Sequence, residues 1–316
     1  MTQSLTHPLY VARWIAAITL AAFVAITSRG SQPAATTAST LWHMINVSPN
    51  EQQADCHLLE FSDGRKVLID VADAADAPGA ACAALKRLNV TKVDLVVISH
   101  FHVDHYGRLL DLIESGVKVT RVAVNIPDEV AAAREAGWGC DLDNVRATVA
   151  TLKEKGVEVF TPKAGDCLIE VPGQTGSAKL VVVALFHGLD SPVGPTDVND
   201  TSIILRLSCG PSSALFTGDL NGALGGWMAQ SNLDLHADIL KAPHHGTEGC
   251  APNIFFDRVH PSAVLIPSPL KLWLSGRSMR IRNYFADKAI PAYVSGIHGD
   301  VLVTFRNDGY SIETER

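Results

Sequence analysis

The sequence predicts an α/β protein, specifically a four-layer αββα sandwich in which two β-sheets pack together between two layers of helices. Two observations lead to this expectation. Short apolar runs with the composition of strands alternate with segments of helical period, and both halves of the chain contain such strands. With 316 residues, of which 47% are hydrophobic and 19% charged, the chain can bury one large core or two small ones.

The first half opens with three short strands and then alternates helices with strands. Residues 62–65, Ser-Asp-Gly-Arg, are typical of a hairpin turn between the second and third strands. A stretch of helical period is interrupted at residues 137–140, Gly-Trp-Gly-Cys. The predicted strands are residues 41–47, 56–61, 66–71, 93–99 and 119–125, and the predicted helical segments are residues 75–88, 108–114 and 129–156.

The second half continues this alternation. A loop rich in glycine, proline, aspartate and serine is expected over residues 188–200. The predicted strands are residues 168–171, 179–186, 199–207, 214–219, a strand that starts at residue 238, and residues 262–267, 292–294 and 300–305, with helices at residues 220–230 and 278–288.

The N-terminal 40 residues differ in composition from the rest of the chain. Residues 9–27 are almost entirely apolar, broken by Arg13, and residues 28–40 are a linker of mostly small residues. The uninterrupted section, residues 14–27, is shorter than the ~20 residues that span a bilayer. This pattern matches a secretory signal peptide, or an uncleaved anchor that attaches residues 9–27 to a membrane. We therefore expect a leader over residues 1–40 and a domain over 41–316, in a protein that is periplasmic, extracellular or membrane-anchored.

Charge and cysteine content narrow the classes of protein further. The net charge of −7 offers no basic footprint for non-specific nucleic-acid binding, although an acidic total is compatible with a local basic groove. The six cysteines contain no Cys-x-x-Cys pair, so a compact thiolate zinc site is not expected. Disulfides in an oxidising compartment and small buried thiols are both compatible with this pattern.

The chemistry of the chain is concentrated directly after the predicted strand at residues 93–99. His100 and His102 are two residues apart and can direct two imidazoles at one metal ion. Asp104 and His105 follow in the next bend and can serve a second ion nearby. Gly107 gives the backbone room where a helix must begin. Three histidines and an aspartate within six residues are typical of a metal or catalytic site rather than of an ordinary solvated loop.

This His-x-His-x-Asp-His order after an apolar strand resembles the signature of the metallo-β-lactamase-fold hydrolases. The resemblance extends from about residue 41 to the C-terminus and is closest to the competence-protein branch. It implies the metallo-β-lactamase fold and two divalent metal ions, usually zinc, with a bridging hydroxide. Manganese or iron are alternatives, because a site of nitrogen and oxygen ligands accepts the metal that is available.

Three later stretches resemble the same superfamily in order. His187 ends a strand where many members place a third ligand of the first metal, and a role in contacting substrate or in supporting a ligand is the alternative. Asp219, in Thr-Gly-Asp, would be the carboxylate that bridges both metals. Leu240 and Lys241 begin a stretch similar to the Leu-Lys-x-x-His-His-Gly-Ser of the competence branch. We expect His245 to bind the second metal and His244 to support it, with the reverse assignment left open.

The opening loop departs from the family pattern. Competence-type relatives carry Asp-Val-Gly-Gln-Gly-Asp where this chain reads Asn-Val-Ser-Pro-Asn-Glu-Gln-Gln-Ala-Asp over residues 46–55, and Asp55 at the end of this loop is kept. The following strand ends in Asp70, as in the family's Leu-Ile-Asp-x-Gly. Contacts that the opening loop makes in relatives therefore do not transfer to this chain.

The ligand set leads to a prediction of hydrolysis. Two divalent cations lower the pKa of bound water towards neutrality, and we expect Asp104 and His245 to take part in catalysis as well as in metal binding. We expect a phosphodiester substrate, in nucleic acid or in a small phosphate ester. Hydrolysis of a lactone, thioester or β-lactam is the enzymatic alternative, and a scaffold with a degenerate site is the non-enzymatic one. No protein partner is expected.

Overall fold

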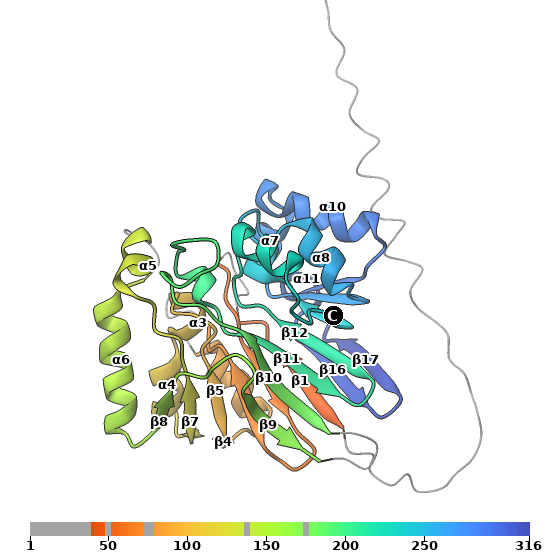
Figure 1. The fold of residues 1–316 in the computed structure, drawn as a ribbon. Coiled ribbons are helices and arrows are strands. Elements are labelled where there is room, and N and C mark those ends of the chain that lie inside the picture. Colours follow the sequence, from red (N-terminus) through yellow and green to blue (C-terminus); the bar gives the residue numbers. More distant parts are fainter. Residues whose placement is uncertain (1–38, 48–51, 73–78, 136–139, 173–176) are drawn as a thin grey trace, which may run out of the picture. The chain divides into compact units, whose positions relative to one another are not determined.

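The computed structural model describes residues 39–47, 52–72, 79–135, 140–172 and 177–316, which form one compact unit within Thr37–Arg316 (Figure 1). The predicted leader, residues 1–40, falls almost entirely outside the described residues, as do residues 9–27. Among the helices that are described, none has the length and apolar character needed to cross a membrane. All six cysteines are free thiols.

Two large sheets carry the fold. The first has eight strands in the order β17-β16-β1-β2-β3-β5-β7-β8, and the second has seven in the order β15-β14-β13-β12-β11-β10-β9. The strands of the first sheet are β1 (Thr40–Met44), β2 (His57–Glu60), β3 (Lys66–Ile69), β5 (Leu95–Val97), β7 (Arg121–Ala123), β8 (Glu158–Phe160), β16 (Val301–Arg306) and β17 (Gly309–Thr314).

The strands of the second sheet are β9 (Cys167–Val171), β10 (Ala178–Ala184), β11 (Ile204–Cys209), β12 (Ser212–Phe216), β13 (Ile239–Lys241), β14 (Ala263–Ile266) and β15 (Ala292–Val294). A separate two-stranded sheet pairs β4 (Lys92–Val93) with β6 (Lys118–Val119). The predicted hairpin of the second half is present, because β11 and β12 pair in antiparallel fashion from Leu205 opposite Phe216 to Cys209 opposite Ser212.

Helices lie outside both sheets. Those after the strands of the first half are α2 (Ala80–Arg87), α3 (Val103–Tyr106), α4 (Leu109–Glu114), α5 (Glu129–Arg134) and α6 (Leu142–Glu154). Those of the second half are α7 (Gly222–Gln230), α8 (Asn253–Val259), α9 (Leu270–Leu274), α10 (Met279–Asp287) and α11 (Ser295–His298), with short 3₁₀ turns η1 (Asn199–Thr201), η2 (Pro243–Gly246) and η3 (Gly276–Ser278).

The alternation of side chains along the strands produces the layers. In β5, Leu95 and Val97 belong to the core between the two sheets, whereas Val96 points to the core under α2, α4 and α6. In β12, Phe216 faces the first sheet and packs on Trp42 of β1 with ring centroids 4.5 Å apart. Leu215 faces the core under α7, α8 and α10. The predicted four-layer αββα sandwich is therefore confirmed.

The sequence did not predict several elements. Strands β8 and β17 are edge strands, of which β8 has three residues and β17 is partly exposed, so neither shows a clear apolar run. Helices α8 and α9 have 7 and 5 residues, which is too short for a clear helical period. The predicted strand at residues 119–125 is divided between β6 and β7, which belong to different sheets.

Candidate metal centre

The predicted site residues converge because strands of both sheets end at the same place. His100 follows β5, which is parallel to β3 and β7, and Asp219 follows β12, which is parallel to β13. His245 lies in η2 directly after β13. Because carboxyl ends of parallel strands lie at one edge of a sheet, loops that are distant in the sequence meet there.

Four of these residues form one buried group. Asp104, His105, Asp219 and His245 each offer a ligand atom, and these atoms all lie within 4.8 Å of one another. Nε2 of His245 is 3.2 Å from Oδ2 of Asp219 and 3.3 Å from Oδ2 of Asp104, and Nε2 of His105 is 3.4 Å from Oδ1 of Asp219. Two imidazoles and two carboxylates are a donor set that divalent zinc, manganese or iron accepts.

The hydrogen bonds behind these imidazoles fix which nitrogen faces the group. Nδ1 of His105 donates to Oδ2 of Asp70 at 2.8 Å, and Nδ1 of His245 donates to the carbonyl oxygen of Pro267 at 3.0 Å. Nε2 of each ring is buried without a hydrogen-bond partner among the described residues. A neutral imidazole with its proton on Nδ1 carries its lone pair on Nε2, so both rings fit a metal ion.

The other two motif histidines form a neighbouring pair. Nε2 of His100 lies 3.1 Å from Nδ1 of His102. The hydroxyl of Ser99 gives its proton to Asp70 at 2.8 Å and accepts from Nδ1 of His100 at 3.1 Å. Nε2 of His102 lies 3.5 Å from the carboxylate of Glu135. The nitrogens that face each other are thus the ones free to bind a cation, Nε2 of His100 and Nδ1 of His102.

The pair and the four-residue group are adjacent, since the rings of His100 and His105 have centroids 4.1 Å apart. Burial, followed by the charges of neighbouring His105 and His102, holds the pKa of His100 well below its usual value. His100 is therefore a neutral imidazole, the form that binds metals. The arrangement suits two cations held side by side.

Within the four-residue group, positive charge on the histidines stabilises the anionic form of the carboxylates. The same positive charge opposes the binding of a metal cation. Burial alone would raise the pKa of Asp104, but the charges of neighbouring His105 and His245 lower it to about 2. Burial would lower the pKa of His245, but Asp219 and Asp55 hold it well above its usual value. A metal ion that binds here must therefore displace a proton.

His244 occupies a different position from His245. Its Nδ1 donates to Oδ1 of Asn221 at 3.2 Å, and its Nε2 lies 3.9 Å from Oδ2 of Asp219. The amide of Asn221 in turn donates to both carboxylate oxygens of Asp197, at 2.9 and 2.8 Å. His244 thus lies at the margin of the group with its free nitrogen directed towards Asp219.

The structure places His187 apart from the other predicted ligands. Its side chain is exposed, and among the described residues no hydrogen bond or ion pair joins it to them. The chain turns away because Leu189 N donates to Oδ2 of Asp128 at 2.8 Å, at the start of α5. A Cβ on Gly188 would lie 2.4 Å from Cβ of Ala131, so the backbone packs closely against α5. As it stands, the loop does not support His187 as a third ligand of the first ion.

Sequence reasoning missed four residues that support the candidate ligands. Asp70 was noted only as a strand end, and Asp55 only as a family residue, although both carboxylates are buried behind His105 and His245. Lys241 is 1% exposed and contacts Asp55 and Asp219. A lysine at the end of an otherwise apolar strand, three residues before His-His, was the available signal. Glu135 gave none, because it follows α5, an alanine-rich helix.

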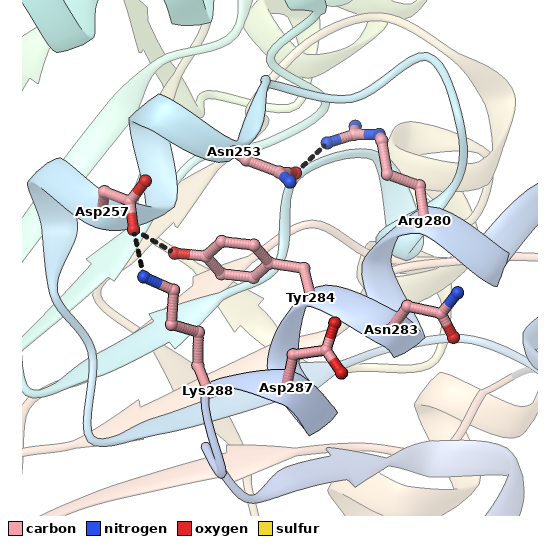
Figure 2. Close-up of a pocket in the computed structure, with 7 residues that line it drawn as sticks. All are labelled: Asn253, Asp257, Arg280, Asn283, Tyr284, Asp287 and Lys288. Carbon is pink, nitrogen blue, oxygen red and sulfur yellow. Dashed lines mark hydrogen bonds and ion pairs between the residues drawn. The ribbon is translucent and has the colours of Figure 1, made fainter.

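A pocket of about 460 Å³ lies elsewhere, between α8 and α10 (Figure 2). Several of its polar groups are paired with one another. Oδ1 of Asp257 accepts from the hydroxyl of Tyr284 at 3.0 Å and from Nζ of Lys288 at 2.9 Å, and Arg280 donates to Asn253 at 2.8 Å. These contacts join two helices, and the described residues that line the pocket include no histidine.

The fold and the site define the class of protein. Residues 49–162 match the model of the Metallo-beta-lactamase superfamily. The metallo-beta-lactamase fold protein YhfI from Bacillus subtilis is 12% identical and superposes with a TM-score of 0.51, over 81% of this chain and 96% of that one.

A relative known by sequence is the "ComE operon protein 3" of Bacillus subtilis (strain 168). It is 25% identical over 214 residues, which are 65% of this chain and 22% of that protein. The chain thus spans about a fifth of the length of this relative. The predicted resemblance to the metallo-β-lactamase superfamily and its competence-type branch is confirmed at the level of sequence and fold.

Proposed function

We propose that this chain is a hydrolase that depends on two divalent cations and acts on a phosphodiester. The observation that carries the proposal is the buried group of Asp104, His105, Asp219 and His245, in which two imidazole nitrogens have no hydrogen-bond partner among the described residues. These nitrogens and the carboxylate oxygens of Asp104 and Asp219 face one another at 3.2 to 3.4 Å, as the ligand atoms around a single metal ion do.

The residues divide into two binding positions in the proposal. His100 and His102 hold the first cation, and Asp104, His105 and His245 hold the second. Asp219 would be the carboxylate shared between the two positions, as the resemblance of its Thr-Gly-Asp stretch implies; its Oδ1 faces His105 and its Oδ2 faces His245. Two bound zinc or manganese ions would lower the pKa of water to near neutrality and polarise the scissile phosphoryl oxygen.

The protein's own groups keep this donor set in place. Gln53 donates to Oδ2 of Asp104 at 3.3 Å. The backbone N–H of Asp219 donates to the hydroxyl of Ser202 at 3.0 Å, and that hydroxyl donates to the carbonyl oxygen of Asn199 at 2.6 Å. Burial of the four-residue group excludes bulk water and strengthens its interaction with a charged substrate.

The choice of a phosphodiester rests on the Thr-Gly-Asp and His-His-Gly stretches, residues 217–219 and 244–246, which resemble the competence-type branch. The substrate is then a nucleic acid or a small phosphate ester. We further propose that residues 1–40 direct export, or that residues 9–27 attach the protein to a membrane, so that it acts outside the cytoplasm. The support for this second part is the apolar leader in the sequence.

The test is turnover of bis(p-nitrophenyl) phosphate by the full chain loaded with zinc or manganese. The proposal expects metal-dependent turnover that Asp104→Ala abolishes and that Asp143→Ala, an exposed carboxylate on α6, leaves unchanged. Protein that holds two metals without turnover would contradict the phosphodiester proposal and favour lactones, thioesters or β-lactams. Protein that holds no metal would favour a scaffold.

A further inference from the structure

Lys241 is a buried cation directly behind the metal centre. It is the last residue of β13, and its side chain is 1% exposed, although lysine is seldom buried unless its charge is paired. The carboxylates of Asp55 and Asp219 both lie beside its Nζ and pair its charge. The side chain is therefore an ammonium ion.

Each proton of this ammonium has an oxygen to face. Nζ donates to the carbonyl oxygen of Gly218 at 2.9 Å, contacts Oδ2 of Asp55, and lies 3.5 Å from Oδ1 of Asp219. An ammonium has three donors, so these three acceptors account for all of them. One of the acceptors is the carboxylate proposed to bridge the two cations, and another is the backbone of the residue before it.

Asp55 carries the effect of Lys241 to the second binding position. Oδ1 of Asp55 is 3.2 Å from Nδ1 of His245, and Oδ2 is 3.8 Å from Nδ1 of His105. The backbone N–H of Asp55 donates to the carbonyl oxygen of Asp104 at 3.1 Å. Asp55 thus lies against three of the four residues of the group, on the side away from their ligand atoms.

We propose that Lys241 is a positioning residue for the second cation. Its ammonium holds Asp55 as an anion behind His105 and His245 and fixes Oδ1 of Asp219, so that the donor atoms of the group keep their arrangement. The inference rests on the proposed metal centre. It adds the buried ion pair of Lys241 with Asp55, neither of which is a proposed ligand.

The same geometry explains why Asp55, Asp70 and His105 do not form a third metal site, although their ligand atoms also lie within 4.8 Å of one another. Nδ1 of His105 gives its proton to Asp70, so it has no lone pair to offer there. The Lys241 ammonium already faces Asp55. The positive charge beside these three residues is therefore the ammonium of Lys241 and not a metal ion.

The test compares zinc binding with folding in the full chain. The variants are Lys241→Met, Asp55→Leu and the double variant, with Lys92→Met as a control because Lys92 is half exposed in a surface pair with Asp94. Zinc affinity is measured by competition with a chromogenic chelator, and thermal unfolding is measured with metal removed. These two measurements use no substrate. If the separate turnover test fails in the parent protein, the phosphodiester proposal is wrong, but the inference about Lys241 is unaffected.

We expect Lys241→Met to weaken binding of the second zinc ion by about 10-fold or more, as loss of a residue that orients ligands typically does. It also leaves Asp55 buried without its ammonium partner, so the metal-free protein unfolds at a lower temperature. The double variant removes both charges, and its unfolding temperature recovers while its zinc affinity stays weak. If affinity recovers together with unfolding temperature, or if Lys241→Met binds zinc like the control, Lys241 is a structural residue only and the inference is wrong.

Discussion

Oδ2 of Asp70 accepts a 2.8 Å hydrogen bond from Nδ1 of His105, and both side chains are buried. The same carboxylate accepts from the backbone N–H of Ser99 at 2.7 Å and from its hydroxyl at 2.8 Å. Asp70 therefore orients both the start of the motif and one of its rings. A carboxylate behind a ligating histidine fixes the tautomer and raises the basicity of the ligand nitrogen.

Asp70→Asn is predicted to reduce zinc affinity by about 10- to 100-fold, because an amide is a weaker acceptor than the carboxylate behind His105. The backbone should tolerate the change, since φ of Asp70 is +60° and asparagine adopts this left-handed conformation readily. Chelator competition measures the affinity. Asp63→Asn, in the exposed hairpin turn, is the matched control, and equal affinity in the two variants would contradict the role of Asp70.

His187→Ala is predicted to change turnover and zinc affinity less than about 3-fold, because its exposed side chain lies outside the site. His102→Ala is predicted to reduce zinc affinity by about 10-fold or more, since it removes one of two facing nitrogens. Metal content after dialysis and turnover of the phosphodiester substrate measure both variants. A large loss in His187→Ala would show that the loop after β10 closes onto the first cation.

The sequence predicts the site best where ligands adjoin one another in the chain. The motif from His100 to His105 follows a strand of mostly apolar, β-branched residues. Asp219 and His245 lie at later strand ends, in the same order as the superfamily motifs. Contacts such as Lys241 with Asp55 depend on which strands are neighbours, which apolar composition alone does not specify. His187 also ends a strand, yet the contact of Leu189 with Asp128 directs the following loop onto α5. A strand-end position therefore predicts the edge of the sheet at which a side chain lies, but not its direction.

Gly218→Ala is predicted to destabilise the fold by about 2 to 3 kcal/mol. A Cβ there would lie 2.4 Å from Oγ of Ser202, and φ is +48°. Gly64→Ala is the matched control, because φ is +87° and nothing lies within 4 Å of its Cβ position. Urea unfolding should show the smaller loss, about 1 kcal/mol, for the control. Equal losses would mean that Ser202 moves aside freely and does not fix the chain before Asp219.

Asp200 is predicted to make the fold less stable as pH rises from about 4 to about 7. Its side chain accepts from the backbone N–H of Asn221 at 2.8 Å, and burial raises its pKa to about 7. Between the unfolded pKa near 3.9 and this value, the folded chain holds a proton that the unfolded chain has lost. The free energy of unfolding therefore falls with pH in this window, by about 1.4 kcal/mol for each unit of pKa shift, and levels off above it.

Asp200→Asn keeps the acceptor for Asn221 and removes the titrating proton, so it should abolish this part of the pH dependence. The measurement is urea unfolding of both proteins at half-unit steps from pH 4 to pH 8. The variant should be similar in stability to the parent near pH 4 and more stable above pH 7, because above pH 7 the parent alone buries a charged carboxylate. Parallel curves for the two proteins would show that the Asp200 carboxyl is solvated or paired when ionised, and would contradict the raised pKa.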